Sequence, residues 1–364
     1  MTPTVEFRIA VFEGDGIGAE ITAPTLRLID RAAVRAGGFS LHYEPCAAGA
    51  MVYRDTGEAL PKTALARAAR ADAILLAAMG LPDIRYPDGR EIAPQIDLRM
   101  ELGLYAGVRP VRSIPGVRPI LANPRAHDID YVILRESTEG LFARQAPGSR
   151  DGDREARETM VITRAISEKL FDFAFALAQK RRRQSHVTCV DKANVFQAFA
   201  FFREIFAERA ARHPSLGHDT AYVDAFAMTM VQKPWVIDVA VTENMFGDIL
   251  SDLGAALMGG MGYAPSADIG DAHAVFQPCH GSAPDIAGKG LANPTAMILS
   301  AAMMLDWLSE TQGVAQAARA GGLLRRAVEA SFAGGDLVTC ELGGDAGTET
   351  VFARVAAALE RLDV

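Results

Sequence analysis

The chain has few cysteines, and they lie far apart. It has 364 residues and four cysteines (Cys46, Cys189, Cys279 and Cys340), none of which forms a Cys-x-x-Cys pair. This spacing disfavours a disulfide framework and a zinc site, and it suits reduced thiols in a cytosol. We therefore expect a cytoplasmic protein.

The sequence also lacks a long apolar run and an excess of basic residues. No apolar segment approaches the ~20 residues of a membrane span, and Glu6 and Arg8 interrupt the first apolar stretch, which argues against a signal peptide. The formal net charge of -8 disfavours nucleic acid or an anionic membrane as a partner. The short run Arg181–Arg183 is more typical of the solvated end of a helix. The composition, 49% hydrophobic and 23% charged, is that of a soluble globular protein with one large or two ordinary domains.

Apolar runs alternate along the chain with helical patterns. Runs such as Phe7–Phe12 and Ala73–Ala78 predict strands, and amphipathic stretches such as Ile17–Arg35 predict helices. This alternation indicates an α/β architecture with a largely parallel sheet. Further strands are predicted at Tyr131–Arg135, His186–Val190, Ala221–Val223 and Val236–Val241, and further helices at Val195–Arg212, Phe246–Leu257 and Thr295–Leu308.

Two segments depart from this alternation. Pro147–Glu158 is polar, rich in Gly and Arg, and without periodicity; it predicts an exposed loop or an arm that reaches another subunit. Pro278–Pro294 is too rich in Gly and Pro for a strand or a long helix. An ordered loop of that length in a compact domain is usually functional.

Asp248 and Asp252 lie four residues apart in the predicted helix Phe246–Leu257, so their side chains project from one helix face. Two neighbouring carboxylates repel each other unless a cation lies between them, and hard oxygen ligands suit Mg²⁺ or Mn²⁺. Most aspartate pairs on helices form a solvated acidic face. The rest of this helix is apolar and small, which favours a metal site.

Three arginines stand in apolar surroundings. Arg135 ends a predicted strand, Arg109 precedes a proline, and Arg99 lies in the stretch IDLRMELG. Charged side chains at such places need partners, and the planar guanidinium matches carboxylates. One such arginine would more often form a structural ion pair, whereas three favour a di- or tricarboxylate substrate.

Lys192 and a glycine-rich turn each allow two interpretations. Lys192 follows the predicted strand His186–Val190, where α/β proteins place ligands, so it could transfer protons; equally, it could simply pair with Asp191 at a helix start. The turn GDGIGA, Gly14–Ala19, fits a dinucleotide fingerprint but also an ordinary tight turn between a strand and a helix.

The order of several long motifs resembles one family, the β-decarboxylating dehydrogenases of 2-hydroxy acids. It includes isopropylmalate, isocitrate, homoisocitrate and tartrate/D-malate dehydrogenases. The motifs run nearly from end to end and read GDGIGAEI, VRPVRS, RESTEG, VDKANV, YVDAFAM, TENMFGDILSDL and HGSAPDIAGKGLANPTA.

The resemblance implies an isopropylmalate dehydrogenase-like α/β fold, which is not a Rossmann fold, with two α/β domains and a central cleft. Residues 1–104 plus 262–364 would form the first, cofactor-side domain, and 105–261 the second domain with the dimer interface. The family's intersubunit arm falls at Pro147–Glu158. Family members are homodimers or larger homo-oligomers because each active site borrows residues from the neighbouring subunit.

The resemblance also assigns roles to residues. It implies that the malate carboxylates bind to Arg99, Arg109 and Arg135, and that Mg²⁺ or Mn²⁺ binds to Asp248, Asp252 and a neighbour's Asp224. The family's metal polarises the C2 hydroxyl and later the keto oxygen. Lys192, beside Asp224, would take the C2 hydroxyl proton. Asn194 and Val195 stand at substrate-binding positions.

The family's adenosine-binding loop corresponds here to 280–293. The cofactor-binding positions in it are His280, Gly281, Ser282, Ala283, Asp285, Ile286 and Asn293. NADP-dependent members typically carry Lys-Tyr where this chain has Asp285 and Ile286. A carboxylate accepts hydrogen bonds from a ribose diol and repels a 2′-phosphate, so the resemblance favours NAD.

Phe142 departs from the family pattern, which has a tyrosine that helps to protonate the enol after decarboxylation. Three interpretations follow. A water or another acid supplies that proton, or the reaction is slower or ends at a different step. Alternatively, the chain is a regulatory subunit of a hetero-oligomeric isocitrate dehydrogenase. A metal-free Rossmann dehydrogenase is a further alternative that rests on the Gly14–Ala19 turn.

The segment before Arg99 recognises the C3 substituent in this family. It reads Pro94-Gln95-Ile96 where isopropylmalate enzymes commonly carry a leucine pair, and Ala93 replaces a serine of isocitrate enzymes. A bare isopropyl group would leave the Gln95 amide unpaired at a cost of ~1–3 kcal/mol. We therefore predict a malate core with a polar or small C3 group.

Overall fold

The computed structural model describes residues 5–143 and 148–363, and a ten-stranded sheet forms its centre. The spatial order of the strands is β2 (Phe39–Pro45), β1 (Val5–Gly14), β3 (Ala73–Ala78), β12 (Ala274–Pro278), β11 (Pro265–Ile269), β4 (Ala106–Arg112), β5 (Asp130–Glu136), β10 (Val239–Thr242), β8 (His186–Asp191) and β9 (Gly217–Tyr222). This arrangement confirms the predicted α/β class.

The sheet is parallel at both ends and antiparallel in the middle. The strand pairs β12–β11, β11–β4 and β4–β5 are antiparallel, and the remaining pairs are parallel. The prediction of a largely parallel sheet is therefore confirmed, although the sequence did not indicate the antiparallel centre. Every residue of β3 and β10 is buried, because helices cover both faces there.

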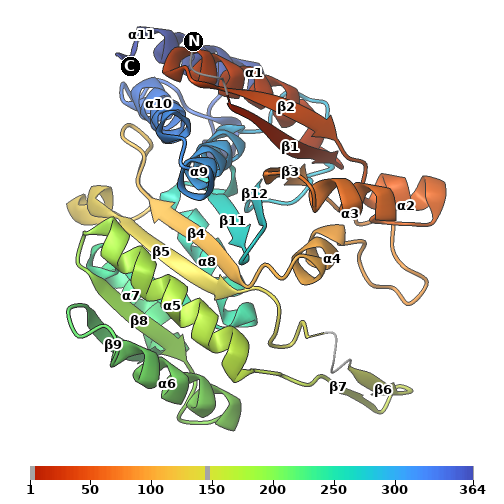
Figure 1. The fold of residues 1–364 in the computed structure, drawn as a ribbon, viewed down its shortest axis with the longest axis vertical. Coiled ribbons are helices and arrows are strands. Elements are labelled where there is room, and N and C mark those ends of the chain that lie inside the picture. Colours follow the sequence, from red (N-terminus) through yellow and green to blue (C-terminus); the bar gives the residue numbers. More distant parts are fainter. Residues whose placement is uncertain (1–4, 144–147, 364) are drawn as a thin grey trace.

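Helices pack on both faces of the sheet (Figure 1). The helices α9, α10 and α5 lie on the viewer's side, and α8 lies on the far side. The longer helices are α1 (Gly18–Ala36), α5 (Arg164–Arg181), α6 (Gln197–Ala210), α8 (Asn244–Met258), α9 (Thr295–Gln312), α10 (Ala315–Phe332) and α11 (Thr348–Arg361). The shorter ones are α2 (Ala50–Thr56), α3 (Lys62–Ala68), α4 (Pro94–Glu101) and α7 (Val223–Gln232).

Two strand predictions need correction. The predicted strand Ala221–Val223 is the end of β9, which begins at Gly217, and Val223 already opens α7. β9 is a mostly exposed edge strand, so it lacks the apolar pattern that would have identified it. The predicted strand Val236–Val241 begins only at Val239, because Pro234–Val236 forms a 3-10 turn.

The polar segment forms a ribbon apart from the main sheet. Strands β6 (Ser149–Asp151) and β7 (Glu155–Arg157) pair with each other, and all their residues are exposed. The ribbon projects from the body of the molecule (Figure 1). Pro147, the first residue of the predicted segment, lies outside the described residues. That the ribbon reaches another subunit stays a prediction.

The strand order separates two parts of the chain. The first five strands in space come from 5–78 and 265–278, and the other five come from 106–242. A domain boundary at 104/105 and 261/262 stays a prediction. In the part of the chain that the structure describes, no helix combines the length and the apolar character needed to cross a membrane.

Candidate active site

The three predicted arginines line one cavity of about 220 Å³. Arg99 comes from α4, Arg109 from the antiparallel strand β4, and Arg135 from the end of β5. All three side chains are largely buried. The structure therefore brings together side chains whose convergence the sequence alone could not establish.

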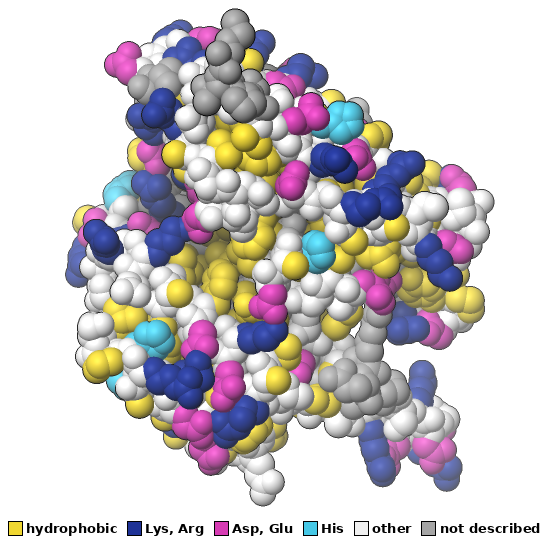
Figure 2. All heavy atoms as spheres, viewed as in Figure 1, with side chains coloured by type: hydrophobic (Ala, Val, Ile, Leu, Met, Phe, Trp, Pro, Cys, Tyr) yellow, Lys and Arg dark blue, Asp and Glu magenta, His cyan; other side chains and the backbone are white. Residues whose placement is uncertain are grey.

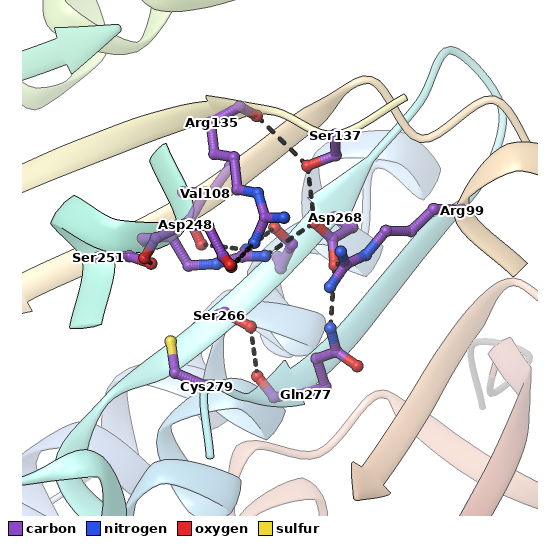
Figure 3. Close-up of polar contacts among 12 residues, drawn as sticks. Arg99, Val108, Arg135, Ser137, Asp248, Ser251, Ser266, Asp268, Gln277 and Cys279 are labelled. Carbon is purple, nitrogen blue, oxygen red and sulfur yellow. Dashed lines mark hydrogen bonds and ion pairs between the residues drawn. The ribbon is translucent and has the colours of Figure 1, made fainter. Parts of the chain in front are cut away.

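A buried carboxylate that sequence reasoning missed holds two of these arginines. Asp268, on β11, accepts from Arg99 Nε at 3.0 Å and from Arg109 Nη2 at 3.0 Å. Two uncharged donors complete its coordination, Ser137 Oγ at 3.2 Å and Gln277 Nε2 at 3.0 Å. Figure 3 shows Asp268 between Arg99 and the other polar groups of the site.

Charge sets the protonation state of Asp268. Burial alone would raise the pKa of this carboxyl, but Arg109, Arg99 and Arg135 outweigh burial and lower the pKa to about 2. Asp268 is therefore ionised and offsets one of the three arginine charges. Burial, with Arg99 next in effect, lowers the pKa of Arg135 to about 10, which still leaves the guanidinium charged at neutral pH.

Helix α8 confirms the predicted placement of the aspartate pair. Glu243 caps its first turn by accepting from Met245 N and Phe246 N. A Cβ at Gly247 would lie 2.6 Å from Arg135 Cβ, so glycine lets the helix pack closely on β5. Asp248 and Asp252 then both face the arginine cavity.

The aspartate pair fits a divalent cation. Burial and the neighbouring charge of Asp248 raise the pKa of Asp252, so a cation between the two carboxylates would stabilise their ionised forms. Asp248 also forms an ion pair with Arg135. Within residues 5–143 and 148–363, no third acidic, His or Cys side chain completes a metal-binding group.

Four predicted residues lie outside this cavity. Lys192, Asn194, Val195 and Asp224 are absent from its lining. Lys192 Nζ donates to Asp224 Oδ1 at 2.6 Å, and this hydrogen bond lowers the pKa of Asp224. The alternative partner of Lys192 is wrong, because Asp191 is buried and instead binds Arg203 through two hydrogen bonds.

The glycine-rich turn anchors neighbouring backbone segments. Gly16 has a φ of 58°, and a Cβ there would lie 2.0 Å from the Ser282 carbonyl oxygen, which accepts from Ile17 N at 2.8 Å. Asp15 is buried and accepts from Ala50 N, Met51 N and Gly80 N. These contacts explain the glycine and the aspartate of the turn without a bound dinucleotide. They also hold the predicted cofactor loop against the end of β1.

The predicted cofactor loop has no regular structure, as expected, and it is firmly attached. Glu20 accepts from Gly288 N at 3.0 Å and from Thr348 Oγ1. Asn293 donates to Glu341 Oε1 at 2.6 Å, while its own Oδ1 accepts from Thr295 N and Oγ1. Glu341 was not predicted; its raised pKa follows from burial.

The remaining loop residues differ in exposure. Gly281 and Asp285 are exposed, and the structure gives Asp285 no partner among the described side chains. Ser282 is buried and donates to the Gly80 carbonyl, Ala283 has a φ of 40°, and Ile286 is half-buried.

Two buried polar atoms in the cavity wall have no hydrogen-bond partner in the part of the chain that the structure describes. These are Gln95 Oε1, from α4, and His280 Nε2. Burial lowers the pKa of His280, so its ring is neutral near pH 7, and Nδ1 lies 2.9 Å from the Gly281 carbonyl. Both atoms offer hydrogen-bonding capacity to a molecule in the cavity. Ile96 lines the cavity beside Gln95.

Phe142 also lines the cavity. Its ring lies beside Arg135, whose guanidinium carbon is 5.5 Å from the ring centroid. The phenylalanine ring therefore faces the arginine cavity, and it has no proton to give.

Comparison with known proteins identifies the family of this chain. The family model "Isocitrate/isopropylmalate dehydrogenase" matches residues 8–355. The 3-isopropylmalate/3-methylmalate dehydrogenase of Methanocaldococcus jannaschii is 41% identical over 355 residues, covering 96% of this chain and 98% of that protein. The isocitrate/homoisocitrate dehydrogenase of Thermus thermophilus is 39% identical over 360 residues, covering 98% of this chain and 99% of that protein.

The fold matches as well. The crystal structure of isocitrate dehydrogenase from Methylococcus capsulatus superposes with a TM-score of 0.86 at 34% identity, covering 98% of this chain and all of that one. The chain belongs to the isocitrate/isopropylmalate dehydrogenase family of oxidative decarboxylating dehydrogenases.

Proposed function

We propose that this protein is an NAD- and divalent-metal-dependent enzyme that oxidises and decarboxylates a malate with a small or polar C3 substituent. The observation that carries the proposal is the convergence of Arg99, Arg109 and Arg135 on one cavity beside Asp248 and Asp252.

The charges of the cavity support a dicarboxylate core. Three arginines and one buried counterion, Asp268, leave a surplus of two positive charges. Two substrate carboxylates would match that surplus, and the planar guanidinium groups suit them. The two remaining carboxylates, Asp248 and Asp252, would match a divalent cation.

Asp248, Asp252 and a partner's Asp224 would hold Mg²⁺ or Mn²⁺. When bound, the metal would polarise the C2 oxygen, and NAD would accept the hydride. Arg99, Arg109 and Arg135 would orient the carboxylates. Lys192 Nζ, held by Asp224, would accept the C2 hydroxyl proton.

Exposed apolar side chains support a site shared between two copies. Val195, Phe196, Met228, Val231 and Ile249 are between 47% and 61% exposed. They come from α7, α8 and the segment after β8, which are also the elements that carry Lys192, Asp224 and Asp248. Pairing of two copies through this surface would cover the apolar side chains and bring Lys192, Asn194, Val195 and Asp224 to the neighbour's cavity.

The cofactor loop supports NAD over NADP. Asp285 is exposed and would accept from the ribose hydroxyls, while repelling a 2′-phosphate. The backbone of His280–Ile286 and the fixed amide of Asn293 would bind the adenosine half. The unpaired His280 Nε2 at the cavity wall would accept from a ribose hydroxyl.

Gln95 supports a polar substituent at C3. Its Oε1 is buried and accepts no hydrogen bond from the described residues, so a hydroxyl that donates to it would be favoured by ~1–3 kcal/mol over a bare alkyl group. The names of the relatives include both alkyl-malates and isocitrate-type acids. The C3 substituent is therefore what the assay has to vary.

The test is a panel of initial rates with isocitrate, homoisocitrate, tartrate, D-malate and isopropylmalate. Each acid is assayed with NAD and with NADP, in Mn²⁺ and in EDTA. We expect NADH formation only with metal and preference for an acid that is polar or small at C3. Gln95→Leu should shift the preference toward isopropylmalate; a wild-type preference for isopropylmalate would contradict the role of Gln95.

The regulatory-subunit alternative rests on Phe142, which lacks the phenol. The same assay decides it. Robust NADH production by the purified homo-oligomer would exclude a purely regulatory role, whereas absence of turnover with all five acids would favour it. Activity that persists in EDTA and in Asp252→Asn would instead favour a dehydrogenase without a metal.

A further inference from the structure

A second cavity of about 270 Å³ lies away from the active site. Its inner wall is apolar, and a shallower groove continues from it along α10 through the shared residues Arg112, Arg325 and Glu329. The apolar wall consists of Pro110, Ile114, Met258, Pro265, Leu299, Met303 and Val328.

The two cavities open on opposite faces of the sheet. On β4, Arg109 lines the active site while Pro110 and Arg112 line the second cavity; on β11, Ser266 lines the first and Pro265 the second. Successive side chains of a strand point to opposite faces. The second cavity therefore faces α9 and α10, on the viewer's side in Figure 1. Figure 2 shows this face hollowed between these helices and β4, with hydrophobic side chains in the floor and Lys or Arg side chains beside it.

Positive charge dominates the border of this hollow. Its lining contains five arginines (Arg112, Arg181, Arg319, Arg325, Arg326) and two carboxylates (Asp130, Glu329). Arg181 binds Asp130, and Arg325 binds Asp306, which lies outside the lining. Arg112 binds Glu329 at 2.9 Å.

Two arginines of the groove have no carboxylate partner among residues 5–143 and 148–363. Arg319 has no ion pair among the described residues, and Arg326 donates only to the backbone oxygen of Asp363. Both side chains are exposed on α10.

Gly322 lies between these two arginines on the same helix face. A Cβ at Gly322 would have no atom within 4 Å, whereas a Cβ at the adjacent Gly321 would lie 2.8 Å from the Ala302 carbonyl oxygen. Packing therefore explains Gly321 but not Gly322. A glycine inside an exposed helix face disfavours the helix by about 1 kcal/mol relative to alanine. Its effect here is to keep the groove open between Arg319 and Arg326.

We propose that this groove binds a small amphipathic organic anion. The phosphate or carboxylate head would lie on Arg319 and Arg326 over Gly322, and the apolar body, of the size of one aromatic ring or a short branched chain, would enter the cavity between Met303 and Val328. Arginine suits the head because its guanidinium donates paired hydrogen bonds to such groups. The apolar wall suits the body by excluding water.

The bound anion would join two elements that are distant in sequence. Arg112 belongs to β4 and Glu329 to α10, and their ion pair already spans the groove. An anionic head beside them would attract Arg112 on β4, while it would repel the carboxylate of Glu329.

The test uses phenyl phosphate as the probe, with titration calorimetry on the intact protein without substrate or nucleotide. We expect saturable binding of phenyl phosphate. Inorganic phosphate has only the anionic head and phenol only the aromatic ring, so each should bind about tenfold more weakly.

Gly322→Leu should fill the groove without disturbing the fold, and it should weaken phenyl phosphate binding by about tenfold or more, as should Arg319→Ala/Arg326→Ala. The matched control, Arg27→Ala/Arg70→Ala, removes two exposed arginines elsewhere and should leave binding unchanged. Binding that is undiminished in Gly322→Leu would place the probe in the active-site arginines and overturn the proposal. Absence of saturable binding to the wild type would also overturn it.

Discussion

At the scale of single residues, Asp268 holds Arg99 and Arg109 in the cavity that we propose for the substrate. Asp268→Asn should raise the KM for the hydroxy acid by about tenfold, because Arg99 and Arg109 lose their shared charged partner. It should lower the free energy of unfolding by about 3 kcal/mol, since a buried ion cluster is left unbalanced. Asp271→Asn, at an exposed carboxylate paired with Lys169, is the control and should cost less than about 1 kcal/mol.

The same carboxylate predicts a dependence of stability on pH. The folded-state pKa of Asp268 is lowered to about 2, so its stabilising contribution is present above the unfolded pKa of about 4 and is lost as the pH falls toward 2. The difference in unfolding free energy between the wild type and Asp268→Asn should therefore shrink between pH 5 and pH 2. A difference that stays constant over this range would show that Asp268 is not ionised against its arginines.

Phe142 gives a second prediction at this scale. Phe142→Tyr should increase the rate at which the ketonised product forms by about tenfold or more, because a phenol beside Arg135 can protonate the enol. The measurement compares formation of the 2-oxo product with formation of NADH in a stopped-flow experiment. Phe142→Leu is the control and should bring no acceleration. An unchanged rate in Phe142→Tyr would mean that another group already supplies the proton.

At the scale of elements, the turn after β1 contacts the loop 280–293, which we propose binds the cofactor. Gly16→Ala should destabilise the fold by more than the roughly 1–2 kcal/mol of a left-handed alanine, because its Cβ would also displace the Ser282 carbonyl. Gly57→Ala, with a φ of 80° and open space around it, is the control for the backbone cost alone. The KM for NAD should rise only in Gly16→Ala. If Gly16→Ala and Gly57→Ala changed stability and the KM for NAD equally, the turn after β1 would not position the proposed cofactor loop.

Apolar spacing predicted several elements with a buried face but not all of them, since the buried strands β11 and β12 were missed. The helix α8 and the strand β3 follow directly from their apolar spacing, whereas the exposed edge strand β9 carries no such pattern. The antiparallel centre of the sheet was also missed, because apolar runs indicate strands but not their direction.

The same limit applies to the site. The motifs identified the arginines and the aspartate pair, but Asp268 lies 169 residues from Arg99 and 159 from Arg109. Only the fold brings them together. The unmatched charge of the arginines was the one available signal that a buried carboxylate had to exist. Glu341, which holds Asn293, had no sequence signal at all.

At the scale of the whole molecule, the proposed active site requires two copies of the chain. Lys192 and Asp224 bind each other at a surface that carries exposed apolar side chains, and neither lines the cavity of its own chain. A complete site would then combine Asp248 and Asp252 of one protomer with Asp224 of the other.

Subunit complementation tests directly whether two chains share each active site. Asp252→Asn and Asp224→Asn should each be nearly inactive as homodimers. When equal amounts of the two variants are refolded together, about half of the dimers should contain one chain of each. Each mixed dimer would have one intact site of two, so activity should recover to about one quarter of the wild type. Native mass spectrometry verifies that mixed dimers form. Mixed dimers that are as inactive as the two parent variants would show that the site is not shared between protomers.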